Sequence, residues 1–337
     1  MSRPAQADWD AAVALLGEAP RAVLLCHVVP DGDALGALLA LARGLRSRGV
    51  EVVASWGSGP DEPFGVPEAY AFLDGDDELT PPAQVPAAPE VLVTLDSGSV
   101  DRLGVLADRV AAARHVLVVD HHPTNPRFGT VNLCDDDAAA TVVLVAELLD
   151  RLGVPLTLEL AAPLYTGLVT DTGSFRYRAT TPQVHELAAR LLATGLRHDL
   201  IARSLWDSSS LAYVQLLGRV CARAQVDAAA ASGLGMVWTC VDTDDLARAG
   251  LAVGDVEGVI DVVRTAREAE VAVVLKQDGG LWKVSTRSRG AIDVGAVCAS
   301  LGGGGHRFAA GFTSTLDRAG TLGSLRAALD AAPHLQA

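Results

Sequence analysis

The clearest structural signal in the sequence is AVLLCHVVPDGDALG, from Ala22 to Gly36, in which a short apolar run passes through polar residues into a helical pattern. The run AVLLCH predicts a buried strand, and from Asp33 onward leucine and alanine recur at helical spacing. Three more strand-like runs follow: EVVASW from Glu51, VLVTLD ending at Asp96 and HVLVVD ending at Asp120. Short strands that alternate with helices predict an α/β fold whose first part is a doubly wound parallel sheet.

The second part of the chain has a different pattern, and the change falls near residue 205. Its strand-like runs, among them VAVVLKQ and LWKVSTRS, predict a smaller α/β domain with a mixed, partly antiparallel sheet. Asp278, Gly279 and Gly280 are typical of a hairpin turn between these two runs. A chain of 337 residues is also long for a single core. We therefore expect one domain over residues 1–205 and a second over residues 206–337, which begins with a short helical linker.

Composition excludes several classes of function. Half of the residues are apolar and the formal net charge is −14, with only two lysines, Lys276 and Lys283. Such a negative chain has no bulk attraction to duplex DNA or to an anionic membrane. The five cysteines are scattered without a C-x-x-C pair, the N-terminus lacks a signal-peptide pattern, and no uncharged apolar run is long enough to span a membrane. We expect a cytoplasmic protein.

Histidines and aspartates gather where the predicted strands end. The carboxyl ends of neighbouring parallel strands share one edge of a sheet, and ligand crevices form there. These side chains are therefore expected to meet in one place. The cluster comprises His27, Asp31, Asp33, Asp96, Asp120, His121, His122 and, after a later helix, Asp171.

So many carboxylates in one crevice repel one another unless cations hold them. Six oxygen and imidazole ligands exceed what one tetrahedral zinc ion takes, and they suit two ions bridged by a shared carboxylate. The carboxylate majority and the absence of thiolates favour Mn²⁺, with Mg²⁺ or Co²⁺ as alternatives. Taken singly, Asp31 or Asp33 is typical of a helix N-cap and His27 of a core histidine. Taken together, the cluster predicts hydrolysis of a phosphate ester or anhydride.

The motifs resemble those of the DHH phosphoesterases, in particular the subgroup with a C-terminal DHHA1 domain. The four DHH motifs resemble CHVVPDGDALG, TLDSGS, VVDHHPTN and YTGLVTDTGSFRY, and the DHHA1 signature resembles LGGGGHRFAAGF. In length and motif form the chain is similar to bacterial nanoRNases. The resemblance implies a metal-dependent phosphodiesterase that acts on short oligoribonucleotides, pApA or cyclic di-AMP, with phosphatase activity on 3′-phosphoadenosine 5′-phosphate (PAP). It also implies a homodimer.

The resemblance further implies a role for each residue of the cluster. One metal ion would be held by His27, Asp31 and Asp96. The other would be held by Asp33, Asp96, His121 and Asp171. Asp96 would then bridge the two ions. Asp120 would orient a ligand histidine, and His122 would hydrogen-bond the scissile phosphate or protonate the leaving oxygen.

Substrate recognition is expected in the second domain. Successive glycine N–H groups over residues 302–305 can form an anion-binding nest, although a flexible turn explains four glycines equally well. The family match assigns phosphate binding to Arg287, Gly304, Gly305 and His306, and leaves Arg289 and Arg307 as weaker candidates. Aromatic residues make up only 4% of the chain, which favours short substrates over long single strands.

Other functions remain open at this point. A protein that binds cyclic dinucleotides without hydrolysing them would not need the complete set of metal ligands. An inorganic pyrophosphatase would share the metal chemistry, but its C-terminal domain has another signature. A tRNA-editing protein with a DHHA1 domain would carry zinc motifs that this sequence lacks. The sequence does not rank the nucleotide substrates.

Overall fold

The computed structural model describes residues 3–59 and 64–335. The chain divides between Ser208 and Ser209 into two compact units. Each unit has its own sheet and its own hydrophobic core.

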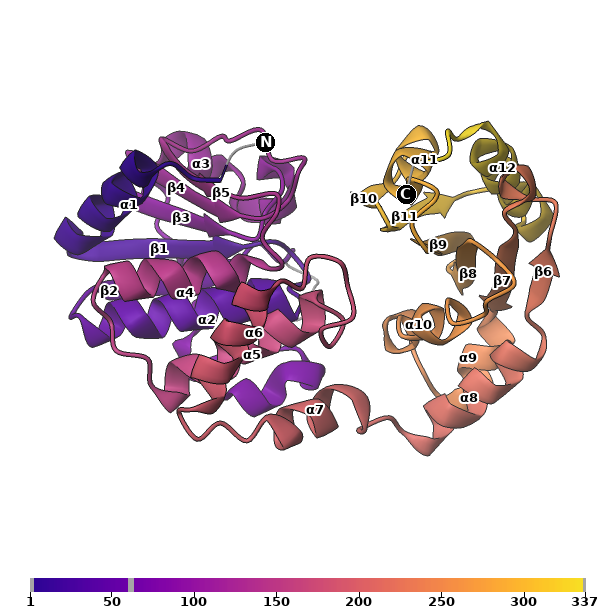
Figure 1. Cartoon of the computed structure of the whole chain (residues 1–337), viewed down its shortest axis with the longest axis horizontal. Helices are drawn as coiled ribbons and strands as arrows, with labels where there is room; N and C mark the ends of the chain where they lie inside the picture. The colour runs from indigo at the N-terminus through magenta and orange to yellow at the C-terminus, as the bar shows by residue number, and fades with distance from the viewer. Residues whose placement is uncertain (1–2, 60–63, 336–337) are drawn as a thin grey trace. The chain divides into compact units, whose positions relative to one another are not determined.

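The first unit is built on a parallel five-stranded sheet with the strand order β2-β1-β3-β4-β5 (Figure 1). Its strands are β1 (Arg21–Cys26), β2 (Glu51–Trp56), β3 (Val91–Leu95), β4 (His115–Asp120) and β5 (Val131–Cys134). The strand order reverses at β1, whose neighbours β2 and β3 lie on opposite sides of it. Open parallel sheets bind ligands beside the carboxyl ends of the strands at such a switch point.

Helical elements cover both faces of this sheet, so the predicted doubly wound fold is confirmed. One face packs against α1 (Gln6–Glu18), α2 (Gly32–Ser47), α4 (Thr141–Arg151) and α5 (Leu158–Asp171). The other face packs against the 3-10 helix η4 (Val100–Leu106) and the segment that follows it, which contains α3 (Asp108–Ala112). Alternate strand residues divide between the two faces: Leu24 packs on the first and Leu25 on the second. The remaining elements are η1 (Glu68–Leu73), η2 (Asp76–Glu78), η3 (Pro82–Gln84), α6 (Pro182–Leu192) and α7 (His198–Trp206).

The central helix α2 carries Asp33 and is buried on nearly every side. This burial explains why leucine and alanine fill it. A glycine at position 36 lets α5 approach closely, because a Cβ at Gly36 would lie only 2.4 Å from the carbonyl oxygen of Pro163. The small residues of α2 therefore bring α5, and with it Asp171, toward the strand ends.

Two segments of the first unit differ from what the sequence pattern suggests. The segment from Arg102 to Arg114 suits a single helix, but Gly104 has φ 58° and ψ −132°, which separates η4 from α3. The pattern also gives no clear signal for β5, because VNLC is only four residues long and half of it is partly exposed. Both features adjoin the strand ends that carry the histidines and aspartates, because the carbonyl oxygen of Arg102 accepts from Val28 N and Cys134 of β5 pairs with Asp120.

The second unit contains the predicted mixed sheet, with the strand order β10-β11-β9-β8-β7-β6. Its strands are β6 (Gln225–Asp227), β7 (Met236–Val241), β8 (Val271–Asp278), β9 (Leu281–Ser288), β10 (Gly304–His306) and β11 (Ala309–Ser314). Only β7 and β8 pair in parallel, and the other neighbours are antiparallel. The hairpin between β8 and β9 turns at Gly279 and Gly280, whose φ angles of 53° and 87° suit a type I′ turn.

Helices again lie on opposite faces of the second sheet (Figure 1). The helices of one face are α8 (Leu211–Ala222), α9 (Thr243–Ala249) and α10 (Val259–Val263), with the 3-10 helix η6 (Val253–Val256). The helices of the other face are α11 (Val294–Ser300) and α12 (Arg318–Ala331), with the 3-10 helix η5 (Ala231–Gly233).

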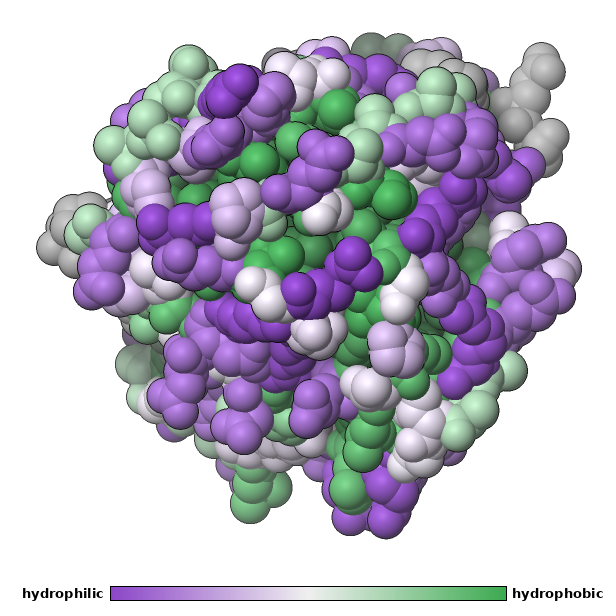
Figure 2. Space-filling view, turned by 90° about the vertical axis from the view of Figure 1, so that its left-hand side faces the viewer, coloured by the Kyte–Doolittle hydropathy of each residue, from purple (hydrophilic) through white to green (hydrophobic). Residues whose placement is uncertain are grey.

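Figure 2 shows hydrophilic and hydrophobic residues interspersed over the visible face of the molecule. Among the described residues, no helix combines the length and the apolar character that crossing a membrane requires.

Candidate metal centre

All eight residues of the predicted cluster lie in the first unit, around the carboxyl ends of β1, β3 and β4. His27 directly follows β1, Asp96 directly follows β3, and Asp120 is the last residue of β4. Asp33 comes from the first turn of α2 and Asp171 from the last turn of α5. The centre therefore sits beside the switch point between β1 and β3, where the sheet topology favours a ligand site.

The first group of side chains surrounds His27, whose side chain is almost fully buried. Its Nε2 lies 3.8 Å from Asp31 Oδ1 and 3.6 Å from Asp96 Oδ2. Its Nδ1 lies 2.8 Å from the carbonyl oxygen of Val28 and donates to it, since a carbonyl can only accept. This contact fixes the ring so that Nε2 faces the carboxylates.

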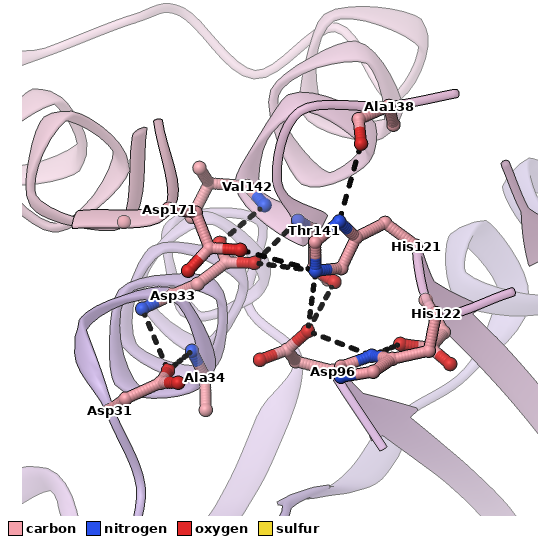
Figure 3. A network of polar contacts seen from close by, with 12 residues as sticks. Asp31, Asp33, Ala34, Asp96, His121, His122, Ala138, Thr141, Val142 and Asp171 are labelled. Carbon is pink, nitrogen blue, oxygen red and sulfur yellow. Dashed lines mark hydrogen bonds and ion pairs between the residues drawn. The ribbon is translucent and has the colours of Figure 1, made fainter. Parts of the chain in front are cut away.

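The second group surrounds His121. Its Nε2 lies 3.2 Å from Asp171 Oδ2, 3.6 Å from Asp96 Oδ1 and 3.9 Å from Asp33 Oδ2. Its Nδ1 donates to the carbonyl oxygen of Ala138 at 3.2 Å. Figure 3 shows the three carboxylates converging on this ring. Each histidine is thus held through Nδ1 and presents Nε2, which is the usual arrangement of a metal-binding imidazole.

Asp96 joins the two groups. One of its carboxylate oxygens faces His27, and the other faces His121 and, at 3.5 Å, Nδ1 of His122. The carboxylate is 2% exposed, and its backbone has φ 53°, a left-handed conformation that only the immediate surroundings can hold in place. Burial disfavours its ionised form, but the neighbouring histidines outweigh burial and hold the pKa of Asp96 well below its ordinary value. Asp96 is therefore a charged group placed between two sets of ligands.

The pKa values of Asp33, Asp171 and His27 are also shifted by burial and by the neighbouring charges. Burial, with Asp96 and Asp171 nearby, raises the pKa of Asp33 well above its ordinary value. Burial also raises the pKa of Asp171 to about 6, with His121 opposing the shift and Asp31 and Asp96 adding to it. Burial lowers the basicity of His27, but its contacts with Asp31 and Asp96 outweigh this effect and raise its pKa to about 10. These opposed shifts reflect repulsion among the carboxylates and attraction to the histidines, and cations relieve such repulsion in a metal centre.

The donor atoms fit divalent metal ions. Ligand atoms of His27, Asp31 and Asp96 lie within 4.8 Å of one another, and so do those of Asp33, His121 and Asp171. All of these donors are carboxylate oxygens and imidazole nitrogens, and no thiolate belongs to either group. Such a set suits hard or borderline cations.

Asp31 is both the N-cap of α2 and a member of the cluster. Its Oδ1 accepts from the backbone N–H groups of Asp33 and Ala34 at 3.1 Å each, so Asp31 caps α2. The capping contact aims the side chain, and the same oxygen then faces His27. For Asp33 the cap interpretation is wrong, because this residue lies inside the first turn of α2 and contacts another helix instead.

His122 and Asp120 form a separate hydrogen-bonded pair. His122 Nδ1 lies 2.7 Å from Asp120 Oδ1, while Asn125 Nδ2 donates to Asp120 Oδ2 at 2.6 Å and to the carbonyl oxygen of Ser97 at 3.1 Å. The expectation that Asp120 orients a ligand histidine therefore needs correction. Asp120 orients His122, because His121 donates its Nδ1–H to Ala138 instead.

Sequence reasoning misses two residues of this centre, Asn125 and Thr141. Asn125 holds Asp120, as described above. Thr141 donates from Oγ1 to Asp96 Oδ1 at 2.8 Å, and its backbone N–H donates to Asp33 Oδ2. Asn125 lies three residues beyond His122, which makes it the easier of the two to suspect. The only signal for Thr141 is local: α4 begins after three alanines, none of which can cap it.

In the second unit, the strand register places Arg287 and His306 on one face of the sheet. Both residues pair with Ala309 of β11, which lies between their strands. Residues paired in this way point to the same side of a sheet, and their Cα atoms are two strand spacings apart, roughly 10 Å. Ala309 has a short side chain, so the side chains of Arg287 and His306 lie on either side of it on the same face.

Gly302 and Gly303, which precede His306, have a structural role. The N–H groups of Gly302 and Gly303 donate to carbonyls of α11, so these two do not form the expected anion-binding nest. A Cβ at Gly303 would lie 2.1 Å from the carbonyl oxygen of Gly311, so only glycine fits beside β11. At Gly304 a Cβ would meet no atom within 4 Å. Gly304 and Gly305 are the two glycines predicted to bind phosphate. Packing therefore does not require glycine at position 304.

Two family models match the chain, one in each of its two parts. The chain matches the model of the DHH family N-terminal domain over residues 21–168 and that of the DHHA1 domain over residues 238–333. It is 37% identical over 288 residues to the bifunctional oligoribonuclease and PAP phosphatase NrnA of Thermus thermophilus, covering 85% of this chain and 82% of that one. The chain belongs to the DHH family.

Two further proteins are similar at lower identity. The cyclic-di-AMP phosphodiesterase GdpP of Geobacillus thermodenitrificans is 27% identical over 314 residues, which cover 87% of this chain and 44% of that longer one. The crystal structure of an exopolyphosphatase-related protein from Bacteroides fragilis has a TM-score of 0.87 at 24% identity, covering 97% of this chain and 96% of that one. This likeness shows a shared fold over 97% of this chain.

Proposed function

We propose that this protein is a metal-dependent phosphodiesterase that hydrolyses short oligoribonucleotides, pApA or cyclic di-AMP to mononucleotides, and that also removes the 3′-phosphate of PAP. The observation that carries the proposal is the pair of ligand groups that meet at Asp96. The named activity of the Thermus thermophilus relative supports the choice of oligoribonucleotides and PAP. The named activity of GdpP supports cyclic di-AMP.

The residues of the centre divide between two ions in this proposal. One ion is held by His27, Asp31 and Asp96, and the other by Asp33, Asp96, His121 and Asp171. When bound, two such ions supply Lewis-acid activation of a phosphoryl oxygen and of an attacking water. Mn²⁺ suits the mixture of carboxylates and imidazoles best, with Mg²⁺ or Co²⁺ as alternatives.

The chain's own groups then position the substrate and move a proton. Asp120 accepts from Nδ1 of His122 and fixes the tautomer of the ring, so that Nε2 serves the substrate. His122 hydrogen-bonds the scissile phosphate or protonates the leaving oxygen. In the second unit Arg287 and His306 bind a substrate phosphate, with the backbone of Gly304 and Gly305 close to it.

A substrate panel tests the proposal. Metal-stripped protein is incubated with and without Mn²⁺ against pApA, short RNA, PAP, cyclic di-AMP and pyrophosphate, and kcat/KM is compared. We expect Mn²⁺-dependent hydrolysis of the nucleotides. Binding of cyclic dinucleotides without turnover would instead show a sensor, and a preference for pyrophosphate would show an inorganic pyrophosphatase.

We also propose that the protein is a cytoplasmic homodimer. All five cysteines are free thiols, which suits a reducing compartment. The dimer is supported only by the family relationship, and the proposed interface is on the first unit. Light scattering should give twice the mass of the 34.9 kDa chain, and a monomer mass would contradict the dimer.

A further inference from the structure

The helix α4 begins without a cap of its own. Its N-cap residue is Ala140, whose methyl group cannot accept a hydrogen bond, and no side chain next to it in the sequence takes over. The first two N–H groups of the helix turn instead to a distant carboxylate. Thr141 N donates to Asp33 Oδ2 at 2.6 Å and Val142 N donates to Asp33 Oδ1 at 2.9 Å (Figure 3). Both oxygens of Asp33 are thus held by the positive end of an eleven-residue helix.

The side chain of Thr141 contacts a second carboxylate of the cluster. Its Oγ1 donates to Asp96 Oδ1 at 2.8 Å. Thr141 and Asp33 are fully buried and Asp96 is 2% exposed, so these hydrogen bonds are shielded from solvent. One residue therefore connects the carboxylate of α2 with the carboxylate that follows β3.

Packing leaves this arrangement little freedom. Gly167 of α5 lies directly against it, and a Cβ at that position would be 2.6 Å from Val142 Cγ1 and 2.8 Å from Asp33 Oδ1. The helices α2, α4 and α5 are therefore in close contact around the Asp33 carboxylate. Only glycine at position 167 leaves room for the Asp33 carboxylate and the first turn of α4.

We propose that Thr141 is a positioning residue of the metal centre. It hydrogen-bonds both Asp33 and Asp96, and it thereby holds Asp96 where this carboxylate can bind both metal ions. The inference rests on the proposed function, since it assumes that these aspartates hold metal ions. Donors to a carboxylate favour its ionised form and fix its orientation, and a metal ligand needs both. The backbone N–H of residue 141 is present in every variant, but only a hydroxyl at this position reaches Asp96.

Variants at position 141 test this role. Thr141→Val keeps the shape and removes the hydroxyl, Thr141→Ala removes it without adding bulk, and Thr141→Ser keeps it. The matched control is Thr166→Val, because Thr166 is also fully buried in a helix, where its hydroxyl donates to the carbonyl oxygen of Ala162. Mn²⁺ affinity is measured by isothermal titration calorimetry of metal-free protein, and kcat and KM are measured on pApA. Thermal melting of the metal-free variants identifies those that keep the fold. If Thr141→Val does not fold, Thr141→Ala takes its place as the hydroxyl-free variant.

Loss of the hydroxyl should weaken Mn²⁺ binding by about 10- to 100-fold, the range typical for residues that hydrogen-bond a metal ligand. It should lower kcat more than it changes KM, because substrate recognition lies elsewhere. The serine variant and the Thr166 control should behave like wild type. Wild-type Mn²⁺ affinity and kcat in a folded hydroxyl-free variant would overturn the inference, as would a serine variant as impaired as valine. If the wild-type protein itself neither binds Mn²⁺ nor hydrolyses pApA, the proposed function fails, and this inference fails with it.

Discussion

His122 Nδ1 lies 2.7 Å from Asp120 Oδ1, and Asp120 is fully buried at the end of β4. An ionised carboxylate can only accept, so Nδ1 carries the proton and Nε2 is the nitrogen that serves the substrate. Asn125 holds the other oxygen of Asp120 from the opposite side. Asn125 thus supports the pair from outside the two ligand groups, although His122 Nδ1 also lies 3.5 Å from Asp96 Oδ1. We expect loss of this support to be separable from loss of metal.

Asp120→Asn tests that separation. A carboxamide has one oxygen and one NH₂ group, so it cannot accept from both His122 and Asn125 as the carboxylate does. We expect kcat to fall by about 10²- to 10⁴-fold, the usual range for loss of positioned acid–base catalysis, with metal content unchanged. Steady-state kinetics and elemental analysis of the same samples measure the two effects. A variant that loses its metal in proportion to its activity would contradict the assignment. In a His122→Ala background the same change should have little further effect.

Asp96→Asn tests the bridge between the ligand groups. Asparagine has nearly the same shape and tolerates the left-handed backbone at this position, so the fold should be kept. Because Asp96 faces both histidines that hold the ions, we expect weaker binding of both ions. The loss of activity should exceed the roughly 10- to 100-fold typical for a residue that only supports a ligand. Elemental analysis after dialysis gives the metal content, and Asp77→Asn, an exposed carboxylate in η2, is the control. Loss of only one ion would rule out the bridging role.

The sequence predicts the strand ends well, and with them most of the cluster. Strand ends are local features, since an apolar run stops at a polar residue, and parallel strands then bring these ends together. His27, Asp96 and Asp120 were placed in this way, and the structure puts them where the pattern predicts. The mixed sheet of the second unit and its hairpin at Gly279 were predicted from equally local signals.

Contacts between distant segments account for what the sequence does not predict. Thr141 lies 108 residues from Asp33 in the sequence, and no periodicity indicates that a helix will begin against that carboxylate. The choice between His121 and His122 as the partner of Asp120 depends on ring orientation, which two adjacent histidines in a sequence cannot reveal. The sequence also does not reveal why residue 303 must be glycine, because this requirement arises only from the close approach of β11.

Arg287→Ala and His306→Ala test recognition by the second unit. Each removes a hydrogen-bond donor from the face that carries Ala309. A hydrogen bond to a charged group contributes about 1.5–3 kcal/mol, so each variant should raise KM for pApA by about 10- to 100-fold with kcat and metal content unchanged. Arg326→Ala is the control, because Arg326 lies on α12 and forms ion pairs with Asp227 and Asp330. A fall in metal content in either variant would argue against the division between catalysis and recognition.

Gly303→Ala and Gly304→Ala separate the structural glycine from the proposed binding glycine. A Cβ at Gly303 would lie 2.1 Å from the carbonyl oxygen of Gly311 and 2.5 Å from Phe312 Cβ, which forces β10 away from β11. Overpacking of this kind typically destabilises by about 1–3 kcal/mol, so the second unit should melt at a lower temperature in calorimetry. At Gly304 the same methyl group meets no atom within 4 Å, so the melting temperature should not change. If the backbone of Gly304 approaches a substrate phosphate as proposed, this variant should instead raise KM for pApA. An unchanged KM in Gly304→Ala would remove Gly304 from the binding site and leave only Arg287, Gly305 and His306 as candidates.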